Sequence, residues 1–215
     1  MTTAYPGGID NFTNPAATDT LASVSHSAQH ANANDAIEAI ENTLGVNPQG
    51  SYASVAARLT GSTLRYGNFY DTTNQTNAST SAANLITVNT SGITNGITIV
   101  DGSKLTFAYS GAYLVNVLSQ AVFTGGASSY DLTVWYSKNG TIVPYSAYTF
   151  TVGSGAQNAQ TLANVENIFT VNAGDYFQFY WYSPASGVTL KATAAGSNPT
   201  RPASPSVNIV AFNVG

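Results

Sequence analysis

The sequence predicts a mainly β protein, in which a C-terminal jelly-roll β-sandwich is preceded by an extended arm and a short α-helical stalk. Three observations lead to this prediction. Clusters of Gly, Asn, Ser and Thr recur through residues 65–215 at the intervals typical of an all-β sandwich. Before them, within residues 25–64, apolar residues follow one another at helical spacing. Residues 1–24 show no sustained period of either kind.

The composition limits the classes of partner. Of 215 residues, 43% are apolar, enough for a sizeable core, but only 7% are charged and the net charge is −4. The six basic residues form no stripe that would neutralise several phosphates, so we expect no nucleic-acid binding. No apolar run reaches the roughly 18 residues of a membrane span, and the first residues, MTTAYPGGID, lack a signal sequence, so we expect neither membrane insertion nor export. A surface of Asn, Ser, Thr and Gly suits neutral partners such as sugars or further subunits.

Residues 1–24 are predicted to be an extended docking arm. A segment so rich in Thr, Ala, Pro, Gly and Asn buries too little apolar surface to order itself. Its isolated apolar residues Tyr5, Ile9 and Phe12 are spaced as anchors of a peptide that docks on another protein. The sequence leaves open the alternative of an unattached tail.

Residues 25–64 are predicted to form the helical stalk. In the run SHSAQHANANDAIEAIENTLG, Ile37, Ile40 and Leu44 follow one another at steps of three and four, which places them on one helical face. This seam has the register of a coiled coil, but so short a helix is not stable alone in water. We therefore expect these three residues to pack against sister helices of an oligomer, or against a body of the protein.

Two glycines should mark the ends of the stalk helices. Gly45 is placed to end the first helix as a left-handed cap. Ser51 is then expected as the N-cap of a second short helix, YASVAARL, with Val55 and Leu59 on one side and Gly61 as its stop.

Residues 65–215 are predicted to be the jelly-roll head. About ten strands with alternating faces and long connections fit two packed sheets better than a meander barrel. Asn139 and Gly140 should close a β-hairpin, and the turn at residues 172–175 should join two antiparallel strands. The candidate strands are 85–88, 97–100, 104–109, 113–123, 132–137, 141–144, 148–152, 165–171, 176–182, 188–194 and 207–213.

The strand at 176–182, YFQFYWY, is the most aromatic part of the chain. Successive side chains of a strand point to opposite faces, so two phenylalanines and a tryptophan form a row that fits the core. The opposite row combines apolar bodies with hydroxyl and amide tips, a mixture typical of a buried interface. We therefore predict that an oligomer interface is formed by Tyr176, Gln178, Tyr180 and Tyr182.

Four stretches of the head occur in a recognisable order: TFAYSGAYLVNVLSQ, VWYSKNGTIVPYS, NIFTVNAGDYFQFYW and PASPSVNIVAFNVG. They resemble the tumour-necrosis-factor-like and complement-head-like jelly rolls of bacteriophage fibre and decoration proteins, over residues 66–215. Domains that look like this are trimers, with aromatic residues of the strand after a Gly-Asp turn near the threefold axis. The resemblance implies a homotrimer whose axis lies near the row that begins with Tyr176.

The run YPGGIDNFTNPAATDTLASVSHSAQHANANDAIEAIENTLG resembles the leading module of many phage structural proteins. In such proteins this module lies at the end opposite the variable C-terminal domain. The resemblance implies that the arm, with Tyr5, Ile9 and Phe12, attaches the protein to another virion protein.

Residues that carry chemistry are few. His26 and His30 are four apart on one helix, but Asp35 is the single further ligand at suitable spacing, so we interpret them as packing and hydrogen-bonding groups rather than as a metal site. The chain has no cysteine, and the carboxylates of the β region fall mostly in turns, with no histidine beyond His30. We expect no catalytic site, no metal and no cofactor.

Loops rich in Gly, Ser and Asn are candidate ligand-binding surfaces. They carry Tyr130, Asn139, Tyr145 and Tyr148, whose rings and amide suit a sugar. The sequence leaves open the alternative that these are ordinary solvent loops.

Together, these patterns predict a non-enzymatic, homotrimeric structural protein located in a phage virion. We favour a short tail or baseplate fibre whose head contacts the host surface, with a surface glycan as the candidate partner. A head fibre or decoration protein of the capsid is the alternative within this class. A bacterial lectin is an alternative from another class, but it would carry a signal sequence, which the first residues lack.

Overall fold

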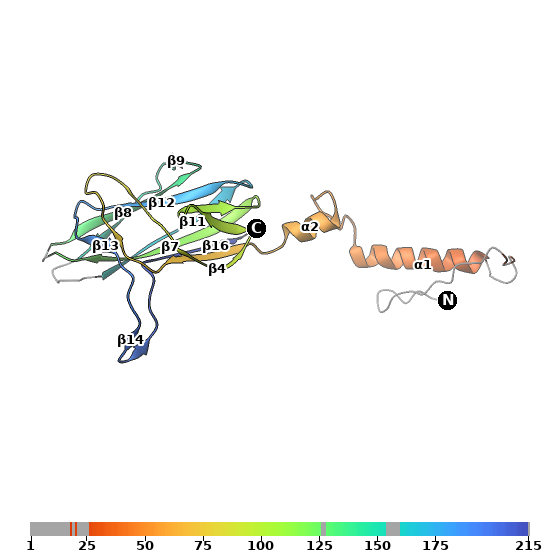
Figure 1. Cartoon of the computed structure of the whole chain (residues 1–215). Helices are drawn as coiled ribbons and strands as arrows, with labels where there is room; N and C mark the ends of the chain where they lie inside the picture. Colours follow the sequence, from red (N-terminus) through yellow and green to blue (C-terminus); the bar gives the residue numbers. More distant parts are fainter. Residues whose placement is uncertain (1–17, 19, 21–25, 126–127, 154–159, 215) are drawn as a thin grey trace. The chain divides into compact units, whose positions relative to one another are not determined.

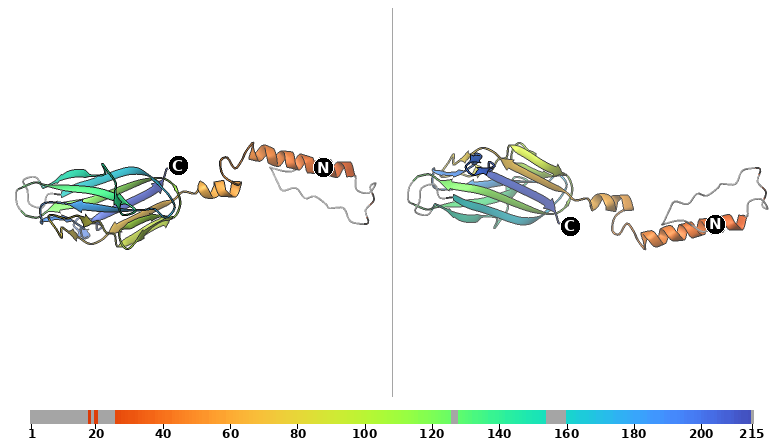
Figure 2. Two further views of the ribbon diagram at one scale, coloured as in Figure 1. Left: turned by 90° about the horizontal axis from the view of Figure 1, so that it is seen from above. Right: turned by 90° about the horizontal axis from the view of Figure 1, so that it is seen from below.

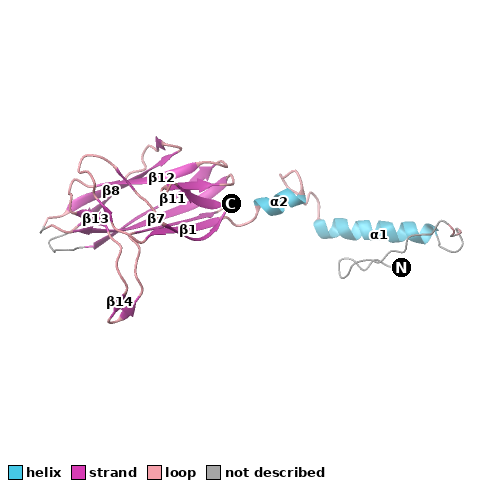
Figure 3. Ribbon diagram, in the orientation of Figure 1, coloured by secondary structure: helices cyan, strands magenta, loops and turns pink. Residues whose placement is uncertain are grey.

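The computed structural model describes residues 18, 20, 26–125, 128–153 and 160–214. The chain divides into two compact units, residues 1–63 and 64–215. Within the described residues, the first unit contains the helices and the second is built from strands (Figure 1, Figure 3). The predicted arm anchors Tyr5, Ile9 and Phe12 lie outside the described residues.

Helix α1 spans His26–Leu44, the segment that the helical spacing predicted. Gly45 follows it with a positive φ of 74°, and its amide donates a hydrogen bond to the carbonyl of Glu41 at 2.8 Å. The predicted left-handed cap is therefore confirmed. Neither helix of the described chain combines the length and apolar character that crossing a membrane requires.

Helix α2 spans Val55–Gly61 and starts later than predicted. Its N-cap is Ser54, whose Oγ accepts a hydrogen bond from the amide of Ala57 at 3.1 Å. The predicted cap, Ser51, was wrong, because it lies within consecutive turns and the residue after it still donates its amide to a turn carbonyl.

The C-terminal end of α2 also differs from the prediction by one residue. Gly61 belongs to the helix, and Ser62 is the cap, with its amide bonded to the carbonyl of Arg58 at 2.9 Å. The ring of Tyr52 lies close to Gly61, since a Cβ at this position would meet it at 2.7 Å.

The head is mainly β, as predicted, and its strands form two large antiparallel sheets. The β7 sheet contains β1 (Tyr66–Asp71), β2 (Gln75–Thr76), β4 (Thr90–Asn95), β7 (Gly111–Phe123), β11 (Gln160–Val171), β13 (Val188–Leu190) and β16 (Val207–Asn213). The β12 sheet contains β3 (Asn84–Leu85), β5 (Ile97–Val100), β6 (Lys104–Phe107), β8 (Tyr130–Lys138), β9 (Thr141–Ile142), β10 (Tyr148–Val152) and β12 (Tyr176–Tyr182). A small separate hairpin consists of β14 (Gly196–Ser197) and β15 (Thr200–Arg201).

The strand order differs between the two sheets. The β7 sheet runs β2-β13-β7-β16-β1-β4, with β11 on the other side of β7, and the β12 sheet runs β10-β8-β12-β6-β5. Seen from below, β16 lies between β7 and β1 (Figure 2, right). The termini of the head are adjacent, because β1 and β16 pair from Tyr66 opposite Phe212 to Asp71 opposite Val207.

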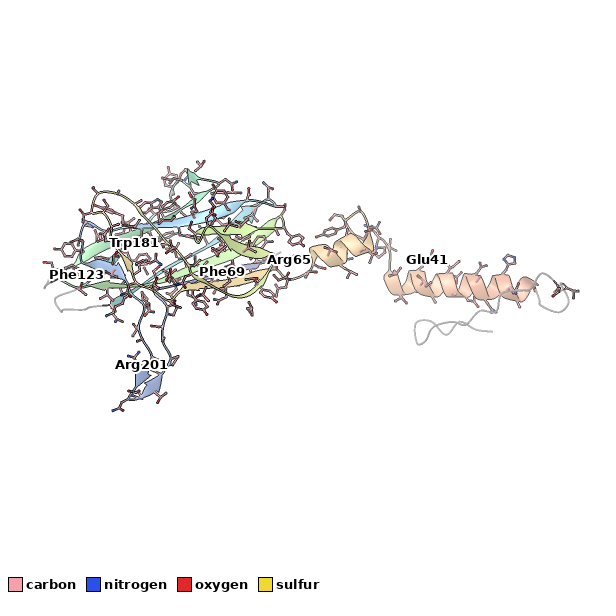
Figure 4. All side chains as sticks on the ribbon, in the orientation of Figure 1. Glu41, Arg65, Phe69, Phe123, Trp181 and Arg201 are labelled. Atoms are coloured by element: carbon pink, nitrogen blue, oxygen red, sulfur yellow. The ribbon has the colours of Figure 1, made fainter. Side chains whose placement is uncertain are left out.

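The core lies between the two sheets. Phe69 of β1 and Ile209 of β16 enter it from the β7 sheet, and Phe179 and Trp181 of β12 enter it from the other. All four side chains are buried, and Figure 4 shows Phe69 and Trp181 within the sandwich. Burial of each large apolar side chain contributes about 2 kcal/mol, so this shared core is what joins the sheets.

The two predicted turns have different outcomes. Asn139 and Gly140 have positive φ values of 51° and 80°, as in a two-residue hairpin turn, and they join the paired strands β8 and β9. The turn at residues 172–175 instead connects β11 of the β7 sheet to β12 of the β12 sheet. It therefore does not close a hydrogen-bonded pair.

Candidate functional site

Three surfaces of the described residues are candidate sites. The first surface is the row predicted as an interface, on the outer face of β12. The alternation is confirmed, since the two phenylalanines and the tryptophan of the strand are buried while Tyr176, Gln178, Tyr180 and Tyr182 are half-buried on the opposite face.

Much of this row already has partners within the chain. The amide of Gln178 donates to Ser103 Oγ at 3.1 Å, and the hydroxyl of Tyr182 donates to the carbonyl of Thr80 at 3.0 Å. The ring of Tyr180 stacks on Trp135 with centroids 5.9 Å apart. The row therefore requires less from a second subunit than the sequence suggested, and its interface role stays a prediction.

The second surface was missed from the sequence and lies on the outer face of the β7 sheet. The register of β11, β7, β16 and β1 places four side chains in one row across the strands. We call this row the apolar stripe: Ile168, Leu114, Phe212 and Tyr66. Ile168 is 59% exposed and Phe212 is 37% exposed, so within this chain much of the stripe is uncovered.

Amides continue the same face beside the stripe. Asn116 donates to Asn164 Oδ1 at 2.8 Å and to Glu166 Oε2 at 3.1 Å, and Asn68 donates to Asn208 Oδ1 at 2.9 Å. Amide side chains form hydrogen bonds without adding charge. Among the outward-facing residues of these four described strands, Glu166 is the single carboxylate. The near-continuous apolar letters GAYLVNVL were the signal that both faces of β7 are suited to burial.

A third surface is the apolar seam of α1. Ile37, Ile40 and Leu44 are 54%, 42% and 49% exposed, respectively, so much of each side chain remains uncovered. The helical spacing of these residues is confirmed, and their contact with sister helices stays a prediction.

The predicted ligand-binding residues do not form one site. Tyr130 begins β8 and Asn139 follows its end, so the nine-residue strand separates them by roughly 25–30 Å. The ring of Tyr130 contacts Phe123, with centroids 4.7 Å apart. Asn139 holds the turn through its side chain, because its Nδ2 donates to Asp175 Oδ1 at 2.7 Å and its Oδ1 accepts from the backbone amide of Tyr176 at 2.9 Å.

Asp175 is the electrostatic centre of that turn. The backbone amide of Asn172, the ammonium of Lys138 and the amide of Asn139 all hydrogen-bond to its carboxylate and lower its pKa to about 2. The charge of Asp175 stabilises the connection between β11 and β12, so we assign it a structural role.

Tyr145 is the predicted ligand residue with the most unusual geometry. Its side chain is fully exposed, and its backbone has a positive φ of 61°. The other described non-glycine residues with positive φ are Asn47, Asp101 and Asn139, which are residue types that tolerate this conformation. The buried Ser146 fixes the turn, since its Oγ donates to the carbonyl of Tyr136 at 3.3 Å. The neighbouring Tyr148 and Ile142 are also exposed.

No group of three or more potential metal-ligating side chains occurs among the described residues. His26 begins α1, and His30 is exposed on the same helix. The sequence matches no protein-family model, and no curated protein is significantly similar to it.

Proposed function

We propose that the protein is a non-enzymatic structural component of a phage virion, a homotrimeric short tail or baseplate fibre with a jelly-roll head. The observation that carries the proposal is that each unit leaves an apolar surface uncovered. The apolar stripe of the head and the seam of α1 both expose large aliphatic side chains to water. Such surfaces are typical of proteins that bury them against further copies.

The pairing of the principal strands supports the jelly-roll assignment. In chain order these strands are β1, β6, β7, β8, β10, β11, β12 and β16. The first pairs with the last, the second with the seventh, the third with the sixth and the fourth with the fifth. This nested pairing is the order expected of a double-sheet jelly roll.

The seam of α1 supports three copies rather than two. Ile40 lies three positions after Ile37 and Leu44 lies four after Ile40, so isoleucine occupies both core positions, a and d, of the first heptad. Isoleucine at both positions shifts the preference of a coiled coil from dimers to trimers or tetramers. The nineteen residues of α1 make a helix of about 28 Å, which is long enough for roughly two heptads.

The Tyr145 turn supports contact between the head and a host surface. The exposed ring of Tyr145 offers an aromatic face on which a sugar ring can stack without displacing a neighbouring side chain. Each contact is weak, but repetition over three heads of one fibre, and over many fibres, increases the avidity without a strong single site.

Attachment to the particle is assigned to residues 1–24 from their sequence resemblance. The location is tested by labelling intact phage particles with gold-conjugated antibodies raised against residues 64–215, viewed by electron microscopy. Label at the tail or baseplate is the expected result. Label spread over the phage capsid would replace the tail assignment with a capsid fibre. Unlabelled particles would contradict the virion assignment. Serum that has been absorbed with the protein is the control for specific labelling.

A further inference from the structure

The hairpin of β14 and β15 is a long excursion that the sheet does not need. Strands β13 and β16 continue one another along β7, with Leu190 opposite Ala121 and Val207 opposite Ser119. Lys191 and Ser206 still make backbone hydrogen bonds to Gln120 of β7, but residues 192–205 leave the sheet, and the hairpin stands well clear of the sandwich in Figure 1. Because the sheet is paired on both sides of this insertion, we look for its role in contact with another molecule.

The hairpin is poorly supported by its own residues. Beyond a single bridge between Thr193 and Ser204, each strand has two residues, and residues 197–203 are all exposed. A two-stranded hairpin without an apolar face is marginally stable in water. A partner on which it lies would supply the missing contacts.

The base of the hairpin adjoins the outer face of the β7 sheet. Its legs and Tyr70, which faces outward from β1, line an open hollow of about 450 Å³. Gln120, which faces outward from β7, donates its side-chain amide to the carbonyl of Pro205. The hairpin therefore rises from the side of the head that also carries the apolar stripe.

The charges of the head point to one partner for the hairpin. Two lysines are paired with aspartates at 2.7 Å, Arg65 lies over the ring of Tyr109, and Asp71 is buried among hydroxyl and amide groups. Four charged residues of the described head remain outside these contacts and form no ion pair: Lys191, Arg201, Asp131 and Glu166. Arg201 lies at the far end of the hairpin, away from the sandwich (Figure 4), and Glu166 lies next to the apolar stripe on β11.

We propose that the hairpin is an arm that lies on the outer face of the β7 sheet of a second copy, where Arg201 pairs with Glu166 of that copy. In a symmetric assembly, the hairpin of one copy and the surface that it contacts on the next copy both belong to the interface. The head fits this requirement, because the base of the hairpin and Glu166 lie on the same face of it. Asp131 is less suitable, because it is on β8 of the opposite sheet. The proposal rests on the proposed trimer and names the contact that each copy adds to it.

Cysteine pairing tests this arm directly, because the natural chain has no cysteine. In the full-length double variant Arg201→Cys with Glu166→Cys, oxidation is expected to convert the monomer band of a non-reducing gel into covalent trimers, and reductant should restore the monomer. The matched control, Arg201→Cys with Asp131→Cys, should stay at the monomer position. A monomer band that persists in the first variant, whether from no disulfide or from one within a chain, overturns the proposal.

Charge exchange gives a second readout if the cysteine variants fold poorly. Arg201→Glu and Glu166→Arg are each expected to weaken association several-fold, and their combination should restore it, whereas Arg201→Glu with Asp131→Arg should not. Absence of rescue overturns the arm. If the natural chain sediments as a monomer, the proposed trimer fails and the arm with it; if the trimer is intact but neither test succeeds, only the arm fails.

Discussion

Tyr145 has a backbone conformation that glycine, asparagine or aspartate usually adopts, and its ring contacts water on all sides. The left-handed conformation costs a tyrosine roughly 1 kcal/mol, and a side chain that is fully exposed on the described head does not offset that cost by burial. The sequence predicted Tyr145 as a ligand residue from loop composition alone. The positive φ could not be predicted, because Val-Pro-Tyr-Ser is compatible with several turn types.

Tyr145→Asn is expected to stabilise the head by about 0.5–1 kcal/mol, because asparagine tolerates the left-handed conformation better. Urea unfolding measures this change. The same variant should weaken adsorption to host cells if the ring contacts the surface. Tyr148→Asn is the control, since Tyr148 lies in the regular strand β10 and should show no gain in stability. A loss of stability in Tyr145→Asn would contradict the account of this turn.

Asp175→Asn is expected to destabilise the head by about 1–2 kcal/mol at pH 7, because the carboxylate accepts three hydrogen bonds that lower its pKa to about 2. Because folding lowers the pKa of Asp175, its carboxylate stabilises the fold at any pH above its unfolded pKa of about 4. This stabilisation is lost as the pH falls toward the pKa of the folded state. The difference between natural and variant proteins should therefore shrink between pH 4 and about pH 2. Thermal unfolding over that range measures it, and a pH-independent difference would exclude this role for the charge.

At the scale of elements, strong apolar alternation made several strands predictable. The predicted bounds of β5, β10, β12 and β16 are those observed. Strand β1 was missed because its inward row contains Gly67, Phe69 and Asp71, of which one is a large apolar residue. The buried carboxylate of Asp71 accepts hydrogen bonds from Thr87 and Asn89, which lie near it only in the folded head.

The seam of α1 should control both helicity and association. Ile40→Lys is expected to reduce the helical circular-dichroism signal and the stability of the trimer, because it places a charge in the proposed contact between helices. Glu38→Lys is the matched control, since Glu38 is exposed and off the seam. Equal effects of the two substitutions would mean that the seam makes no such contact.

At the scale of the whole molecule, the mainly β head predicted from the sequence is confirmed, whereas the oligomer interface predicted on the β12 row stays a prediction. The apolar stripe could not be recognised, because its four residues come from four strands and are aligned only by the register of the sheet. The aromatic row of β12 is contiguous in the sequence, and its internal partners, such as Trp135, are not. Pairing between distant segments therefore decides which apolar surface is free.

Substitution on each face separates the two interfaces. Ile168→Asp is expected to dissociate the trimer into folded monomers, because the side chain is already 59% exposed in a single head and its loss does not open the core. Tyr180→Asp is the comparison on the other face. Dissociation by Tyr180→Asp with an intact Ile168→Asp trimer would favour the β12 row over the apolar stripe as the interface.

Self-association is the central claim, and sedimentation equilibrium of the full-length protein measures it without labels or standards. Across micromolar concentrations, the mass should be three times the 22.3 kDa of one chain and should not fall on dilution. A mass of one chain at all concentrations would mean that the apolar stripe and the α1 seam are stable in water, and it would contradict the proposed fibre.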